Sequence, residues 1–485
     1  MSVLDHFLVF LYITALYLIT WFTLRKDKNV KSTNLTEKKT AEKHFLASRS
    51  IGVVEAVFSI VATEFSALTF VQLPALVLLG KSGLLWGGVG VVLGRYLISN
   101  FLLKNFYRSG LTVFDSLARG VNNYTEITQS TRRAQRMMAS IYFFSKILSV
   151  SSAVYLGVTF ISLFYELDFT LVLIFVIFLT AIYTIVGGLK VVMRTDILQF
   201  WAIVLGGIVL VFMTAEKIED YSFVQIIPTI KNASLGSASF SSIFIGIFTG
   251  LITDFSTHGV EQEFVQKLKA CKTPTVASRA VVLSTFLTVG LQALFILIGS
   301  IFLLKHPTFS GEITDSIKFF MKETINYLNS GSKGLVVVAI LAATMSSLDS
   351  ALNALSTVLW NDILPPSRFI RYPLLIKIDN IVVVFFVCLF SFFVAQNPMY
   401  IKGFFTLNFY ILLPLVCCFV IRFACYPWIR FPFHLHSVIF IILSCFLGLI
   451  LNSIYFHFPW VIAVFICILL SILTIWFYGE LKKWI

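Results

Sequence analysis

The chain has 485 residues, of which 58% are hydrophobic and 13% are charged, and its formal net charge is +13. A soluble domain needs about a quarter of its residues charged to cover its surface, so the composition excludes a soluble enzyme and a soluble binding module. The basic residues lie between apolar runs and not in a Lys/Arg-rich domain, so we expect no nucleic-acid partner and a lipid bilayer as the solvent of the chain.

Apolar runs long enough to cross a bilayer, about twenty residues each, recur along the whole chain. The first is followed by a basic run and not preceded by one, which is the reverse of a secretory signal and predicts a retained span with its N-terminus outside. The predicted spans are 6–24, 51–79, 84–103, 137–164, 169–187, 191–214, 240–264, 276–304, 333–360, 374–395, 400–422, 433–454 and 459–478. The sequence therefore predicts an all-α polytopic membrane protein with about 13 transmembrane helices.

Lys and Arg are concentrated in alternate loops between these spans, beginning with the segment 25–49. Basic loops stay in the cytoplasm, so the pattern predicts an N-out, C-in topology. The longest segments on the outer side, 215–239 and 305–332, are too short for an independent core. We therefore expect no enzymatic headpiece and no sensor module. The seven cysteines show no metal-ligand spacing and are expected to be small core residues.

The second span carries a polar cluster at its middle, in the stretch Ala62 to Thr69, which reads ATEFSALT. A helix broken there would free backbone carbonyls, which a membrane protein tolerates only where they line a cavity or bind something. Freed carbonyls suit a hard cation such as Na+. The alternative is a continuous helix whose Ser and Thr hydroxyls bond back to their own turn.

The ninth span carries hydroxyls at helical spacing. Ser346, Ser350, Asn353 and Thr357 are separated by four, three and four positions and form one polar stripe, with Ser347 on the adjoining one. Hydroxyl oxygens are ligands that a desolvated Na+ accepts. The alternative is a packing face of small residues joined by hydrogen bonds.

Ionisable side chains inside spans are costly and mark a pathway or an ion pair. They are Glu55, Glu64, Arg95, Lys146, Asp196, Asp254 and Asp349. Two interpretations of Lys146 stay open. It holds a carboxylate on a solute, or Lys146 or Arg95 neutralises Glu64, because an unpaired buried charge is strongly destabilising.

Four motifs resemble the sodium:solute symporter family, which includes the sodium/glucose, proline, pantothenate, sialic acid and iodide carriers. They are FLASRSIG followed by VATEFSALTF, then GGLKVVMRTDILQ, GVEQEFVQKLKACK and AATMSSLDSALNALSTVLWNDI, and they occur in the family's order over about 45–362. The resemblance implies a LeuT-type fold of two inverted five-helix repeats within one transporter domain, 1–485. It places the first repeat at 51–214 and the second at 240–422, with 6–24 and 433–478 as peripheral helices.

The resemblance also implies ion sites. The family's shared Na+ site would use the carbonyls of Ala62, Phe65 and Ala343 and the hydroxyls of Ser346 and Ser347. Some members bind a second Na+, and the matching positions here are Asp196 and Ser350, with Asp349 where some members have a second hydroxyl. For Asp196 the alternative is a capping or ion-pair role with Arg194 or Lys190.

The expected function is a sodium-coupled secondary active symporter that imports a small organic solute or anion across the bacterial cytoplasmic (inner) membrane. Na+ is the coupling ion, and no catalytic residue is expected. The residues expected to face the solute are Glu64, Ser66, Thr69, Lys146, Ser149, Asp254 and His258. The sialic acid carriers have an arginine where this chain has Ser149, so the resemblance does not extend to that solute.

Two alternatives remain open at this stage. One is a proton-coupled carrier on the same scaffold, with Glu64 or Asp196 as the titrating group; His258 is a weaker candidate for that role, because a hydrogen-bonded structural histidine explains it as well. The other is a transporter-like sensor without flux. The sequence leaves the solute, the Na+ stoichiometry and the oligomeric state undetermined.

Overall fold

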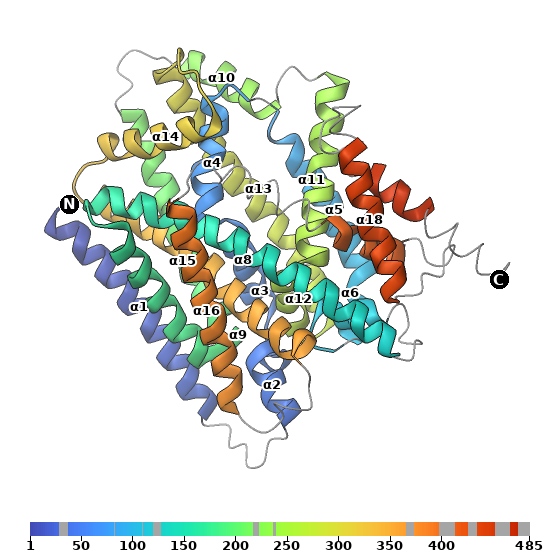
Figure 1. Cartoon of the computed structure of the whole chain (residues 1–485). Helices are drawn as coiled ribbons and strands as arrows, with labels where there is room; N and C mark the ends of the chain where they lie inside the picture. The colour runs from blue at the N-terminus through green and yellow to red at the C-terminus, as the bar shows by residue number, and fades with distance from the viewer. Residues whose placement is uncertain are drawn as a thin grey trace.

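The computed structural model describes most of the chain as helices (Figure 1). The described residues are 1–28, 37–81, 83–108, 110–119, 128–216, 223–235, 239–364, 373–396, 413–424, 434–451 and 466–473. Within these ranges, eight helices are long and apolar enough to cross a membrane, and one bent helix pair makes a ninth candidate. The predicted spans 400–422, 433–454 and 459–478 lie partly outside the described residues, so the count of thirteen stays a prediction.

The long helices confirm the membrane class and follow the predicted spans closely. They are α1 (Val3–Lys28), α8 (Gln129–Tyr165), α9 (Phe169–Glu216), α11 (Phe240–Val260), α13 (Pro274–Lys305), α15 (Ser332–Val358) and α16 (Pro373–Gln396), and the span Trp86–Tyr107, which begins with α5 (Trp86–Leu97). The shorter helices are α2 (Glu37–Leu46), α3 (Val53–Glu64), α4 (Ala67–Leu78), α6 (Leu103–Arg108), α7 (Val113–Arg119), α10 (Phe223–Leu235), α12 (Gln262–Ala270), α14 (Ile313–Tyr327) and α18 (Leu435–Leu451).

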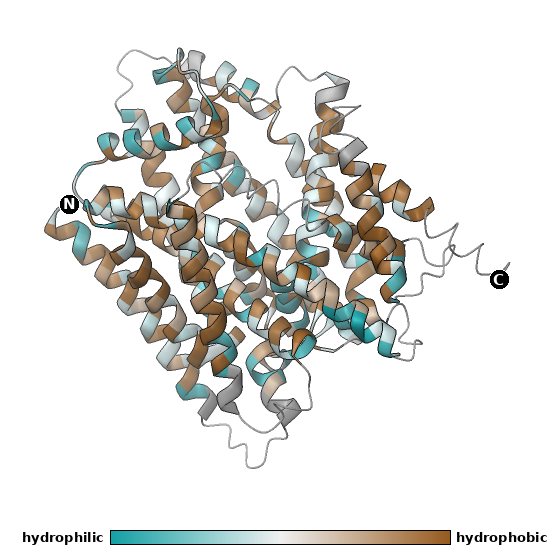
Figure 2. Cartoon of the chain, in the orientation of Figure 1, coloured by the Kyte–Doolittle hydropathy of each residue, from teal (hydrophilic) through white to brown (hydrophobic). Residues whose placement is uncertain are grey.

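Outer helices present hydrophobic side chains to their surroundings. Large apolar side chains of α1 are strongly exposed, among them Phe7 at 56% and Phe10 at 67%. Hydrophobic residues dominate α1 and α16, whereas hydrophilic residues mark α14 and the first turns of α8 (Figure 2). Because exposed apolar surface of this extent is unfavourable in water, these faces are in contact with lipid.

The helix α9 contains a break where the sequence predicts a boundary between two spans. Gly188 has a φ of 60° and a ψ of −166°, which is not helical. A Cβ at this position would lie 2.6 Å from the carbonyl oxygen of His44 on α2. Glycine is therefore required both for the conformation and for the close approach, and the two predicted spans 169–187 and 191–214 meet at this residue.

The helix α15 lies at the centre of the bundle (Figure 1). In its most apolar stretch, 94% of α15 is buried inside the protein, whereas the corresponding share of α1 is 22%. It packs against α9, α8, α1, α16 and α3. Because its neighbours are helices and not lipid, the hydroxyls of its polar stripe find partners inside the protein, which removes the cost of placing them in hydrocarbon.

A seam of glycines joins α5 to α11. A Cβ at Gly90 would lie 1.9 Å from the carbonyl oxygen of Ile247, and a Cβ at Gly250 would lie 1.9 Å from that of Gly87. Such approaches are open only to glycine, which lets two helix backbones come into direct contact. The seam brings Arg95 on α5 within bonding distance of Asp254 on α11.

Candidate functional site

The second predicted span is broken, and it bends by 58° between α3 and α4. Phe65 leaves the helix with a φ of −89° and a ψ of 74°. The N–H of Ser66, which would bond to the Ala62 carbonyl in a continuous helix, donates to the Glu64 carbonyl at 3.1 Å. The N–H of Thr69, which would bond to the Phe65 carbonyl, donates to the Ser66 hydroxyl at 3.3 Å. The carbonyls of Ala62 and Phe65 are therefore released from the helical ladder.

The hydroxyls of α15 meet this break. The Ser347 hydroxyl donates to the Ala343 carbonyl at 3.1 Å and lies 3.4 Å from the Thr63 carbonyl. The Ser346 hydroxyl donates to Asp196 Oδ1 at 2.6 Å. A donating hydroxyl keeps its lone pairs free to accept a cation. Released carbonyls and such hydroxyls are neutral oxygens of the kind that binds Na+. The Ala343 carbonyl differs from those of Ala62 and Phe65, because it lies inside α15 and accepts from the Ser347 hydroxyl.

Asp196, assigned by the resemblance to a second ion site, is wholly buried and receives three donors. The Ser59 and Ser346 hydroxyls donate at 2.5 and 2.6 Å, and the Lys267 ammonium donates to Oδ2 at 2.9 Å. The alternative of an ion pair thus has Lys267 of α12 as its partner. Arg194, considered for that role from the sequence, bonds to Glu55 at 3.1 Å.

The other two residues of the second predicted ion site, Asp349 and Ser350, bond to each other and to further partners. Asp349 accepts a hydrogen bond of 2.5 Å from the Tyr183 hydroxyl and one of 3.2 Å from the Ser350 hydroxyl. Ser350 also lies 2.9 Å from the Thr63 hydroxyl. Tyr183 comes from α9, in a segment with no ionisable residue beside it, and sequence reasoning missed it as the partner of Asp349.

Arg95 is the centre of a buried ion-pair cluster. Its guanidinium donates to Glu64 at 2.5 Å, to Asp254 at 3.0 Å and to the Ser284 hydroxyl at 2.7 Å. Thr288 adds a hydrogen bond of 2.8 Å to Glu64. Of the two cations considered for neutralising Glu64, the structure places Arg95 there.

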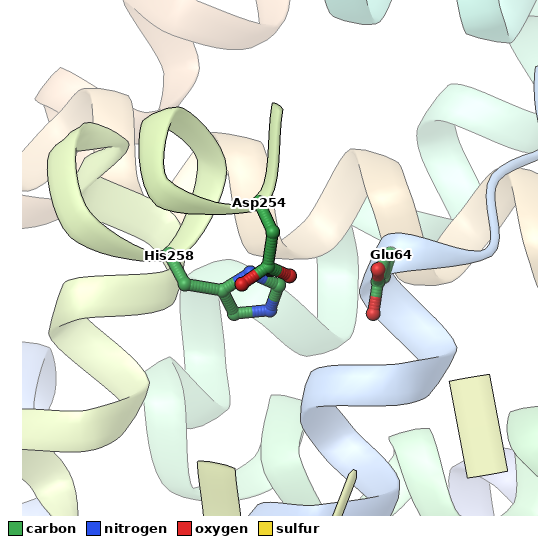
Figure 3. A group of neighbouring side chains, drawn as sticks. All are labelled: Glu64, Asp254 and His258. Carbon is green, nitrogen blue, oxygen red and sulfur yellow. Dashed lines mark ion pairs between the residues drawn. The ribbon is translucent and has the colours of Figure 1, made fainter. Parts of the chain in front are cut away.

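Glu64, Asp254 and His258 bring one ligand atom each within 4.8 Å of one another, which is a metal-like grouping. Figure 3 shows Asp254 and His258 projecting from one helix toward Glu64 across the gap. His258 Nδ1 lies 3.0 Å from Asp254 Oδ1. Arg95 already bonds to both carboxylates and places one positive charge between them, so we interpret the grouping as an ion-pair cluster and not as a metal site.

Lys146 lies at a second helix break, between α11 and α12. Glu261 occupies the break in an extended conformation, with a φ of −72° and a ψ of 126°. The Lys146 ammonium donates to Glu261 and to Glu263, at 2.5 Å each. Because two carboxylates of the chain already bind this ammonium, it is not a free cation for the carboxylate of a solute.

A cavity of about 540 Å³ opens beside the break of α3 and α4. Its lining includes six of the seven residues predicted to face the solute: Glu64, Ser66, Thr69, Lys146, Ser149 and Asp254. The seventh, His258, is wholly buried and its ring lies 4.5 Å from that of Phe264. Ser347 also lines the cavity, so the cavity reaches the candidate ion site. Sequence reasoning missed Thr288 and Gln292, which α13 contributes to the lining.

A broken helix against a hydroxyl-bearing central helix, with a cavity beside the break, defines a LeuT-type transporter fold. The chain aligns with a Na+-coupled sialic acid symporter in a substrate-bound outward-open state with a TM-score of 0.78, at 18% identity, over 97% of this chain and 96% of that one. It aligns with the nucleobase-cation-symport-1 family transporter Mhp1 in a closed conformation with a TM-score of 0.61, at 14% identity, over 90% and 94%.

Residues 44–426 match the model of the sodium:solute symporter family, and the chain belongs to this family. It is 22% identical over 346 residues to the human sodium/iodide cotransporter, covering 68% of this chain and 52% of that protein. It is 25% identical over 342 residues to the sodium/sialic acid symporter SiaT of Proteus mirabilis, covering 67% and 66%. The matched segments therefore span about half to two thirds of these relatives. The apolar helices and the family together define an integral membrane protein.

Proposed function

We propose that the chain is a sodium-coupled secondary active symporter that imports a small organic solute across the bacterial cytoplasmic (inner) membrane, with Na+ as its coupling ion. The observation that carries the proposal is the break between α3 and α4. It releases the carbonyls of Ala62 and Phe65 in the same segment whose Thr63 carbonyl lies 3.4 Å from the Ser347 hydroxyl. The proposed Na+ ligands are the two released carbonyls, the Ala343 carbonyl and the hydroxyls of Ser346 and Ser347. Family membership supports the same activity.

The proposed division into two inverted repeats, 51–214 and 240–422, with 6–24 and 433–478 outside them, has support from the two breaks. The first helix of each proposed repeat is interrupted, one between α3 and α4 and the other at Glu261 between α11 and α12. The two helices are also tied together, because Ile51 donates to the Ala270 carbonyl at 3.2 Å and accepts from the Lys272 N–H at 3.1 Å. Midplane breaks of this kind are where such transporters bind ions and solutes.

The proposed mechanism couples the two sites through the break. Na+ between α3, α4 and α15 holds the released carbonyls against the Ser347 hydroxyl and favours the outward-open state. The solute then binds in the cavity beside Glu64, and both leave when the inner half opens. An ion drives transport in this way only if its affinity differs between the two states.

The charges around the cavity bear on the class of solute. One ammonium and four carboxylates line it: Lys146 against Glu64, Asp254, Glu261 and Glu263. The buried Arg95 lies behind them and balances one further negative charge. The remaining negative potential repels anions, so among the solutes considered a neutral or cationic one is favoured over an anion.

Replacing Ser347 with alanine is expected to raise the Na+ concentration for half-maximal uptake about tenfold or more, because losing an interaction with a charged group costs ~1.5–3 kcal/mol. Uptake into proteoliposomes as a function of Na+ concentration measures the effect. Ser356→Ala is the matched control, since Ser356 is also buried on α15 and its hydroxyl has no hydrogen-bond partner in the described part of the chain. An identical Na+ dependence in the Ser347 variant would remove this residue from the site.

Transport assays separate the proposal from its two alternatives. Uptake that is unchanged when Na+ is removed at fixed pH would exclude sodium coupling and leave the proton-coupled carrier as the alternative. Absence of flux for every solute that binds would indicate a sensor. The solute itself is found by screening candidate compounds for a rise in melting temperature with and without Na+, since a ligand that binds only the folded state stabilises it.

A further inference from the structure

Lys267 is the feature of this molecule that neither the ion site nor the solute cavity explains. It lies on α12, within the VQKLK stretch, and its side chain is wholly buried. Its ammonium donates to Asp196 Oδ2 at 2.9 Å, to the Ser59 carbonyl at 3.0 Å and to the Thr63 hydroxyl. An ammonium that is taken out of water is stable only when paired and fully hydrogen-bonded, and these three oxygens meet that requirement.

We propose that the Lys267 ammonium is a resident cation that takes the place of a second Na+ beside Asp196, so that one Na+ accompanies each solute. This inference rests on the proposed sodium-coupled transport and specifies its stoichiometry. A second ion was expected at Asp196, and the residues present do not fit one, because the Asp196 carboxylate is already paired with a cation of the chain itself.

The ligands of the ammonium are those of an alkali cation. They comprise a carboxylate, a backbone carbonyl and a hydroxyl, which are the oxygen types that bind hard cations. The carboxylate of Asp196 also accepts from Ser59 and Ser346. A Na+ bound to the same oxygens would lie within a few ångströms of the ammonium in a dry interior, where two like charges repel strongly.

The remaining residues of the expected second site also have hydrogen-bond partners within the chain. The Ser350 hydroxyl donates to Asp349 Oδ1, and the other oxygen of that carboxylate accepts from Tyr183. Asp349 is therefore held by neutral donors. Ser350 reaches Thr63, whose hydroxyl is itself bound to the ammonium. The polar groups near Asp196 thus form one network with Lys267 as its only cation among the described residues.

A tethered cation differs from Na+ in what it contributes to transport. Lys267 is on α12, whereas its partners Ser59, Thr63 and Asp196 are on α3 and α9. The ion pair between Lys267 and Asp196 therefore connects the two proposed repeats without any bound ion. Because the ammonium never dissociates into the cytoplasm, its charge does not add to the charge moved with the solute.

The test is the Na+ stoichiometry of Lys267→Ala. In proteoliposomes we expect the wild type to show a Hill coefficient for Na+ of about 1, and the variant to approach 2 because the freed Asp196 site now accepts an ion. The ratio of Na+ to solute transported should rise from one to two. Lys267→Arg keeps a cation and should stay at one. Lys269→Ala removes a neighbouring buried lysine that donates to Thr112 and should also stay at one.

One further variant and one further measurement extend the test beyond uptake by Lys267→Ala. Lys267→Met combined with Asp196→Asn removes both charges and should fold with a stoichiometry of one. The melting temperature of purified Lys267→Ala should show a steeper dependence on Na+ than that of the wild type. Two Na+ per solute in the wild type, or one in a folded Lys267→Ala, would overturn the inference. Uptake by the wild type without any Na+ dependence would instead overturn the proposed function.

Discussion

Replacing Arg95 with methionine is expected to destabilise the folded protein by about 3–5 kcal/mol, which is the cost of removing one partner from a buried ion pair. The Arg95 side chain is fully buried, and Asp254 is 1% exposed. Without the guanidinium, the buried Asp254 carboxylate is left facing His258, and Glu64, which is 21% exposed, is left with the Thr288 hydroxyl. We expect a lower melting temperature in detergent and a reduced yield of monodisperse protein by size-exclusion chromatography.

Two comparisons identify the cause of this loss. Arg194→Met removes an arginine from the partly exposed pair with Glu55, whose side chains are 25% and 27% exposed, and should cost only ~0.2–1 kcal/mol. Adding Glu64→Gln and Asp254→Asn to Arg95→Met should recover much of the lost stability, because no unpaired charge remains. If Arg95→Met and Arg194→Met melt at the same temperature, the buried cluster does not hold α5 to α11 as we infer.

Substituting alanine at Gly90 is expected to destabilise the folded protein strongly. Overpacking typically costs ~1–3 kcal/mol of folding free energy, and we expect a loss at the upper end of this range or a protein that does not fold. The added Cβ would lie 1.9 Å from the Ile247 carbonyl oxygen and 2.5 Å from the Leu251 nitrogen. Both are backbone atoms of α11, so no side chain can move away to relieve the contact. The helices must separate, and the pairing of Arg95 with Asp254 is lost with them.

Whether a Gly→Ala substitution lowers or raises the melting temperature distinguishes an effect of close packing from one of helix propensity. Gly→Ala inside a helix normally stabilises it by roughly 0.5–1 kcal/mol. Gly290→Ala on α13 is the matched control, because nothing lies within 4 Å of its added Cβ. We expect a small rise in melting temperature for Gly290→Ala and loss of folded protein for Gly90→Ala. If Gly90→Ala melts at the same temperature as the wild type, α5 and α11 do not pack as closely at Gly90 as we infer.

Hydropathy and charge patterning were sufficient for the membrane class and for most helix positions. The spans 6–24, 137–164 and 276–304 fall within α1, α8 and α13. A segment in lipid must form its backbone hydrogen bonds internally and expose apolar side chains. Both requirements depend on neighbouring residues, so the local sequence is enough to predict such a helix. The four motifs predicted membership of the sodium:solute symporter family, and the match of residues 44–426 to the family model confirms it.

Part of the candidate site was also readable from local patterns. The polar cluster between Ala62 and Thr69 marked the place where a helix break was one of two possibilities. Ser66 accounts for the break physically, because its hydroxyl caps α4. The spacing of Ser346 and Ser347 predicted that their hydroxyls face inward. These features depend on a few neighbouring residues, so the sequence expresses them directly.

The partners of the charged residues were decided by the tertiary structure alone. Spacing identified Glu64, Lys146 and Asp196 as buried and in need of compensation, and it left several partners open for each. Lys146 bonds to Glu261 and Glu263 across the break of α11 and α12, which no periodicity indicates.

Asp196 and Lys267 show the same limit most clearly. They are 71 positions apart, and the sequence places Lys267 among basic residues of a cytoplasmic loop. The fold turns α12 back into the bundle, where the lysine becomes a buried cation. Burial and polarity are local properties that a sequence determines by itself. Which charges meet depends on how distant helices cross, because an ion pair in a dry interior forms only where packing brings its two members within bonding distance.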